Sequence, residues 1–317
     1  MIRSILLRRL VSGVITLWLI SVVIFAVLHV LPGDPRLIAL GDEYTQEQWD
    51  AMTREMQLDQ PLLTQYGSWL KGLVTLDWGS SLMSPYPISE LLGSAIYYTA
   101  LLTLFVMILV IPIATVIGVY SAVHSGRLAD NVASFLTLSL AAMPGFAIAV
   151  LTIYFLATNV FRIFPGSSIF DPNVSVWSQL ELFALPVLAS VLGLIPYPIR
   201  MVRAAMIEAL ESDAVMVARL KGLPERTVIF RHALRMCLGP IVQAFGLTLV
   251  FLSGGTIIVE TVFSYPGVGY ELIQGVGRRD FPVIQTLVVI LAFFTIVLNL
   301  LTDLAVMIVT PRLRTRM

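Results

Sequence analysis

The 317-residue chain contains little charge and almost no cysteine. Charged residues make up 13% of it, against the roughly 25% that is usual in soluble domains. Lysine plus arginine balance aspartate plus glutamate at 20 each, so the zero net charge gives no general attraction to nucleic acid. The single cysteine, Cys237, excludes an internal disulfide and a cysteine-rich metal site.

The sequence also lacks the motifs of common catalytic sites. It contains no GxxxxGK[ST] phosphate loop, no HExxH and no GxSxG. The three histidines, His29, His124 and His232, are far apart and do not have metal-ligand spacing. No apolar run carries an arginine ladder of the voltage-sensor type. We therefore expect no catalytic residue, no bound cofactor and no metal in this chain.

Long apolar runs are what the sequence does have. Hydrophobic residues make up 57% of the chain, and six runs are long enough for the roughly 20 residues that a bilayer core requires. The first is too long for a signal peptide and is followed by LPGDPR, not by a small-x-small cleavage site. We predict an all-α integral membrane protein. Its six transmembrane helices are expected at 10–31, 99–123, 132–158, 182–201, 241–263 and 284–309.

Arginine placement predicts the orientation. Three arginines precede the first run and three close the chain, while the segment 32–98 carries nine acids against three bases. Since lysine and arginine are retained on the cytoplasmic side, both termini are expected inside and 32–98 outside. The expected domains are an N-terminus with the first helix at 1–31, the outer loop at 32–98, and a core at 99–317. Within that core, the cytoplasmic loop is 202–240.

The outer loop has helical patterns of its own. TQEQWDAMTREMQL begins with Thr45 and has Gln48 three residues on, which is a capping-box signal. QPLLTQYGSWLKGLV places Pro61 at a second helix start. Trp49 and Trp69 fall on the apolar faces of these helices. We expect two short helices that form either a folded cap without a partner or a platform for an external protein.

The cytoplasmic loop contains DAVMVARLKGLPERTVIFRHALR, residues 213–235. Gly222 stands where a left-handed C-cap belongs, and Pro224 stands at the first turn of the next helix. The pattern predicts a helix, a tight turn and a second helix. Its basic residues are explained either by topology and lipid headgroups or by docking into the groove of another protein.

The apolar runs contain breaks, small residues and a few ionisable groups. Pro144 interrupts the third run, and Gly118 predicts a close helix contact. Ionisable groups in lipid are costly and usually functional. Three polar residues therefore remain candidates either for structural pairing or for a pathway or gate. They are Glu260 late in the fifth run, and Asn299 and Asp303 late in the sixth.

Residues 213–235 closely resemble the cytoplasmic coupling loop of ABC-importer permeases of the dipeptide, oligopeptide and nickel class. FAVLHVLPGDPR and ETVFSYPGVGYELIQGVGRRDFPVIQ resemble two further signatures of that family. Met216 departs from the general importer motif, which has a glutamate there, so a glutamate salt bridge to an ATPase is not implied. The coupling residues that the resemblance implies are Asp213, Val217, Ala218, Arg219, Lys221, Gly222, Leu223 and His232.

The resemblance implies a permease subunit that is not itself an enzyme, in the bacterial cytoplasmic (inner) membrane. Its implied partners are a second homologous permease, two cytoplasmic ATP-binding subunits that hold ATP and Mg, and an extracytoplasmic substrate-binding protein. The implied cargo is di- or oligopeptides, with glutathione or a nickel chelate as alternatives. A function of another class, a stand-alone secondary transporter or channel, would normally show inverted repeats and a midplane acid, and neither is evident.

Overall fold

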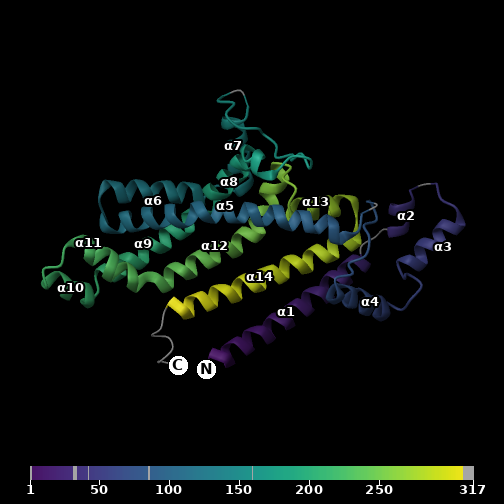
Figure 1. The fold of residues 1–317 in the computed structure, drawn as a ribbon, viewed down its shortest axis with the longest axis horizontal. Coiled ribbons are helices and arrows are strands. Elements are labelled where there is room, and N and C mark those ends of the chain that lie inside the picture. Colours follow the sequence, from purple (N-terminus) through teal and green to yellow (C-terminus); the bar gives the residue numbers. More distant parts are fainter. Residues whose placement is uncertain (1, 31–33, 42, 85, 159, 310–317) are drawn as a thin grey trace. The chain divides into compact units, whose positions relative to one another are not determined.

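The computed structural model describes residues 2–30, 34–41, 43–84, 86–158 and 160–309 (Figure 1). Within these ranges the regular structure is helical, apart from one isolated antiparallel bridge between Ser80 and Pro87. The predicted all-α class is therefore confirmed. The chain forms two compact units: unit one is Met1–Thr99 with Pro266–Ile296, and unit two is Ala100–Tyr265 with Val297–Met317.

Unit one contains the outer helices that the sequence predicts. Its helices are α1 (Ile2–Val30), α2 (Pro35–Leu40), α3 (Gln46–Glu55), α4 (Leu62–Thr75), α13 (Val268–Arg278) and the first parts of α5 (Ile88–Val123) and α14 (Phe281–Val309). The capping box before α3 is confirmed, because the Gln48 N–H donates to Thr45 Oγ1 and the Thr45 N–H donates to Gln48 Oε1. Helix α4 follows Pro61, also as predicted.

Two features of unit one differ from the sequence prediction. The short helix α2 was not predicted; it begins at Pro35, where Asp34 accepts a hydrogen bond from the Arg36 N–H. Helix α5 begins at Ile88, well before the expected boundary at 98. Its first turns are stabilised by an apolar cluster with α13 and α14, to which Leu92, Val268 and Leu287 contribute.

Unit two contains the remaining helices. They are α6 (Leu128–Ala141), α7 (Gly145–Leu156), a 3-10 turn (Val176–Gln179), α8 (Glu181–Leu194), α9 (Pro196–Leu210), α10 (Asp213–Leu220), α11 (Glu225–Thr227), a π-helical segment (Val228–Ala233) and α12 (Leu234–Val262). Close helix contacts fix their packing. A Cβ on Gly118 of α5 would lie 2.9 Å from the carbonyl oxygen of Ile199 on α9, which confirms the close contact predicted there.

Among the described residues, four helices are long and apolar enough to cross a membrane, and up to six spans result if each of two bent helix pairs is one span. The pair α6 and α7 bends by 104°, and the pair α8 and α9 bends by 43°. The first bend differs from the single helix predicted for 132–158; it lies where Pro144 lacks the N–H that a continuous helix needs. Residues 31–33 and 310–317, with the LPG of the first signature and the last arginines, lie outside the described residues.

Candidate functional site

The segment 202–240, which we call the hairpin, folds around Gly222. Figure 1 shows α10 and α11 at one end of unit two, beyond the ends of α9 and α12. Gly222 has φ 73°, so it adopts the left-handed conformation that the sequence predicts. The Leu223 N–H donates to Ala218 O at 3.4 Å and the Gly222 N–H donates to Arg219 O at 2.9 Å. These two bonds form a Schellman motif, which ends α10 and turns the chain.

Helix α10 has one buried face and one exposed face. Val215 and Ala218 are buried, and the helix packs there against α9 and the π-helical segment. The opposite face is apolar and open: Met216 is 53% exposed, Val217 47% and Leu220 80%. These three residues and Asp213 recur at helical spacing. In the part of the chain that the structure describes, this open face has no partner, and it consists of Asp213, Met216, Val217 and Leu220.

An ion pair closes the turn of the hairpin. Arg219 Nη2 lies 2.6 Å from Glu225 Oε1, and Arg219 Nε lies 3.3 Å from Glu225 Oε2. Both side chains are about half exposed, so the pair contributes on the order of 0.5 kcal/mol. Its main effect is geometric, because it joins α10 to α11 across Gly222. The positive charge of Arg219 is thus already engaged within the hairpin.

The other residues that the resemblance implies are spread along the hairpin. Asp213 begins α10, Lys221 is its exposed C-cap, and Leu223 and His232 are half-buried. Ala218 has its side chain buried against the neighbouring helices, so it supports the hairpin from within. The sequence did not predict the π-helical segment Val228–Ala233, a form that is frequent at functional sites.

A buried ion pair, which the sequence prediction missed, holds the base of the hairpin. Asp130 of α6 is 2% exposed, and it accepts from Arg203 Nε at 2.6 Å and Arg203 Nη2 at 2.7 Å. It also accepts from the Gly126 N–H at 2.9 Å and from the Ser121 hydroxyl. Arg203 lies on α9, which leads directly into α10. We call these four residues the clamp, since they join α9 to α6 and to the end of α5.

The pathway or gate candidates do not form one cluster. A Cβ on Gly246 of α12 would overlap Thr302, so Asp303, the next residue of α14, lies near the level of Gly246. Glu260 lies further along α12, about 20 Å away at 1.5 Å per residue. Glu260 is fully buried, Asp303 is half-buried, and Asn299 is exposed on the turn before it. Only Asn299 and Asp303 are neighbours.

Among the described residues, no group of three His, Cys, Asp or Glu side chains is placed to hold a metal ion.

The chain matches two family models. Residues 114–315 match the binding-protein-dependent transport system inner membrane component, and residues 1–86 match the N-terminal part of the binding-protein-dependent transport system membrane component.

Curated relatives match over almost the whole length. A probable peptide ABC transporter permease protein of Sinorhizobium fredii is 30% identical over 98% of both chains. A putative peptide transport system permease protein of Brucella melitensis is 30% identical over 99% of both. A glutathione transport system permease protein of Escherichia coli is 31% identical over 97% of this chain and 98% of its own.

Proposed function

This chain belongs to the family of binding-protein-dependent transport system inner membrane components, and we propose that it is the permease subunit of an ATP-driven peptide importer. In this proposal it has six spans, counting each bent helix pair as one, and both termini face the cytoplasm. The long apolar helices and the asymmetric arginine distribution support that arrangement. Its partners are a second permease, two ATP-binding subunits and an external binding protein.

The proposed cargo is a peptide. Relatives of nearly equal length and about 30% identity are named as peptide or glutathione permeases. Glutathione is itself a tripeptide in which one bond runs through a side-chain carboxyl, so the two names describe related chemistry. We take di- or oligopeptides as the cargo and glutathione as the alternative. Both are favoured over a nickel chelate by these names.

The hairpin is the surface that receives movement from an ATP-binding subunit. The observation that carries this assignment is the open apolar face of α10, with Met216, Val217 and Leu220 on a short helix of fixed geometry. An apolar face of this kind suits a helix that is laid into a groove on another protein. The basic residues of the hairpin could be explained by membrane topology alone, because such residues are retained on the cytoplasmic side. Membrane topology does not explain the open apolar face.

The clamp passes that movement to the bundle. Because Arg203 is bound by Asp130, a displacement of α10 and α9 pulls on α6 and on the end of α5. Packed helices switch between discrete arrangements and do not deform continuously. A small shift at the hairpin is therefore converted into a rearrangement of the spans. Glu260, Asn299 and Asp303 remain proposed contacts for the cargo or the gate.

Isolation of the chain from its partners tests this function. Purified alone in lipid nanodiscs, the chain is expected to hydrolyse no ATP, because its sequence offers no phosphate loop. Hydrolysis is expected only with co-purified cytoplasmic subunits, and the external binding protein with its peptide should stimulate it. Robust hydrolysis by the chain alone would contradict the proposal. Solute uptake driven by an ion gradient without ATP would favour a secondary transporter instead.

A further inference from the structure

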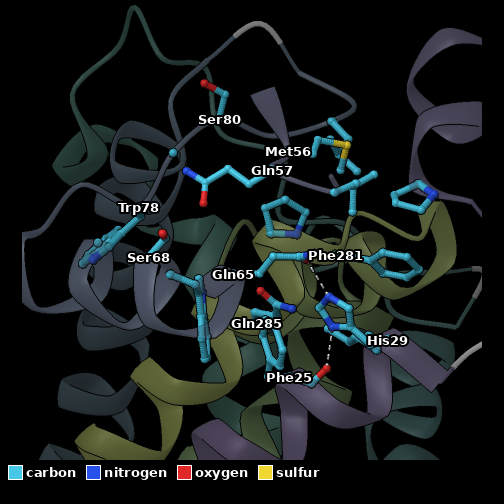
Figure 2. A pocket seen from close by; sticks show the side chains of 18 of the residues that line it. Phe25, His29, Met56, Gln57, Gln65, Ser68, Trp78, Ser80, Phe281 and Gln285 are labelled. Atoms are coloured by element: carbon cyan, nitrogen blue, oxygen red, sulfur yellow. Dashed lines mark hydrogen bonds between the residues drawn. The ribbon is translucent and has the colours of Figure 1, made fainter. Parts of the chain in front are cut away.

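Unit one contains a cavity of about 850 Å³ that the proposed coupling mechanism does not use (Figure 2). It is bounded by the end of α1, by α4, by the start of α14 and by the loops around Asp34, Gln57 and Ser80. All of these segments belong to one compact unit. The volume lies within the range of pockets that hold small ligands.

The floor of the cavity carries a buried amide. Gln285, on the second turn of α14, is only 8% exposed and lines the cavity. Figure 2 shows its amide turned into the open space. No hydrogen bond to this amide is present among the described residues. A polar side chain in such a position is usually hydrogen-bonded, so the cavity presents one amide that a ligand can pair with.

Two indole rings contribute aromatic surface to the lining of the cavity. The Nε1 atoms of Trp69 and Trp78 are buried and have no hydrogen-bond partner within the described part of the chain, and both residues line the cavity. A tryptophan N–H is a donor only. Because these two nitrogen atoms are closed to the accessible space, a ligand in the cavity contacts the carbon atoms of the rings and not their N–H groups.

The opposite wall carries a second amide on a strained backbone. Gln57 has φ 54°, which is unusual for a residue other than glycine and is found at binding sites. Figure 2 shows its side chain reaching into the cavity, opposite Gln65 and Gln285. Gln65 is already held at both ends, since its Oε1 lies 3.2 Å from His29 Nε2 and its Nε2 donates to Gln60 O at 2.9 Å. The amide of Gln65 is thus held in place by its own hydrogen bonds, whereas the amides of Gln57 and Gln285 face the cavity.

The charge of the cavity favours a ligand that is not a phosphate. Arg36 is bound by Asp34 at 2.6 Å and by Thr53 at 2.9 Å, and it lies 3.9 Å over the ring of Trp49. Its guanidinium holds the pKa of the Asp34 carboxyl below its usual value. The positive charge of Arg36 is therefore already compensated. Beside this compensated pair and the carboxylate of Asp77, the cavity offers neutral donors and acceptors together with aromatic faces.

We infer that this cavity binds the main chain of a short peptide, so that the permease carries its own site for the cargo. Each peptide residue presents one N–H and one C=O, which match the two faces of a glutamine amide. Small side chains would pack on the rings of Trp69, Trp78 and Phe281. This inference rests on the proposed function, because it assumes that the cargo is a peptide.

Equilibrium dialysis of radiolabelled tri-alanine against the full chain in lipid nanodiscs tests the site. The chain is expected to bind the peptide saturably. Gln285→Leu should weaken the affinity about 10-fold or more, because a lost hydrogen bond of ordinary strength corresponds to about that factor. Trp69→Phe combined with Trp78→Phe should weaken it less, because each phenyl ring keeps part of the aromatic surface. Gln57→Ala, at an exposed position, should weaken it too without disturbing the core.

Matched variants outside the cavity serve as controls. Gln46→Leu changes an exposed glutamine of α3, and Trp177→Phe changes a tryptophan that is 59% exposed in unit two. Both should leave the affinity unchanged. The inference is overturned if the folded chain does not bind tri-alanine, or if all cavity variants bind it as the unaltered chain does.

A parallel uptake assay on the complete complex separates this inference from the proposed function. If the complex imports tri-alanine but its permease binds none, the cavity assignment fails while the importer assignment stands. If the complex imports no peptide at all, the proposed function itself fails. If the cavity variants lose affinity for the external binding protein and keep it for tri-alanine, the cavity is a docking pocket for that protein, and the inference is wrong.

Discussion

Replacement of Gly222 by valine is expected to abolish substrate uptake while the chain remains inserted and paired with its sister permease. Gly222 has φ 73°, and a Cβ there would meet no atom within 4 Å. The cost is therefore one of backbone conformation and not of collision. A Cβ in the left-handed region costs roughly 1 kcal/mol and a branched side chain costs more. The Schellman turn should open, and α10 should leave its angle to α11.

Uptake into reconstituted vesicles, measured beside the ATPase rate and the co-elution of subunits, tests this result. The ATP-binding subunits should either dissociate from the valine variant or hydrolyse ATP without transport. Gly222→Asn is the matched control, because asparagine adopts the left-handed conformation readily, and it should keep most of the uptake. Normal coupled uptake in Gly222→Val would mean that the hairpin is only a topological anchor.

Loss of the clamp is expected to lower substrate uptake and stability, with an effect second only to that of Gly222→Val. Asp130→Leu removes a carboxylate that is 2% exposed and accepts from Arg203, Gly126 and Ser121. Breaking a buried pair costs about 3–5 kcal/mol, and the lower end applies because the Arg203 side chain is 30% exposed. Uptake should fall together with stability, since α9 would no longer be held to α6.

A double-mutant cycle isolates the pair. Arg203→Leu alone should also destabilise, because it leaves the buried carboxylate without its cation. The double variant should lose less stability than the sum of the losses in the two single variants, because residues in contact are coupled. Unfolding in detergent, followed by the loss of helical circular dichroism, measures all three variants. Strictly additive losses would show that Asp130 and Arg203 do not act as a pair.

The features that the sequence predicts best depend on neighbouring residues. The Thr45 and Gln48 capping box, the left-handed Gly222 and the two outer helices each follow from side chains only a few positions apart. Local rules of this kind carry over to the folded chain because their hydrogen bonds close within one or two turns. The main apolar segments also follow from composition.

The features that the sequence misses depend on distant residues. Asp130 and Arg203 are 73 positions apart, and neither stands in a motif that would identify its partner. The early start of α5 at Ile88 depends on packing against α13 and α14. The cavity around Gln285 needs α14 beside the loops of the outer segment. No local pattern brings such elements together, because tertiary packing decides them.

Cross-linking from the open face of α10 is the most direct test of the claim that the hairpin meets an ATP-binding subunit. Because Cys237 is the only cysteine and is buried, Cys237→Ser gives a background for single-cysteine variants. In the assembled complex, Val217→Cys should be joined to an ATP-binding subunit by a short bifunctional reagent. Val215→Cys, two residues away on the buried face, should not be joined. Failure of Val217→Cys to cross-link in a complex that still transports peptide would contradict the account.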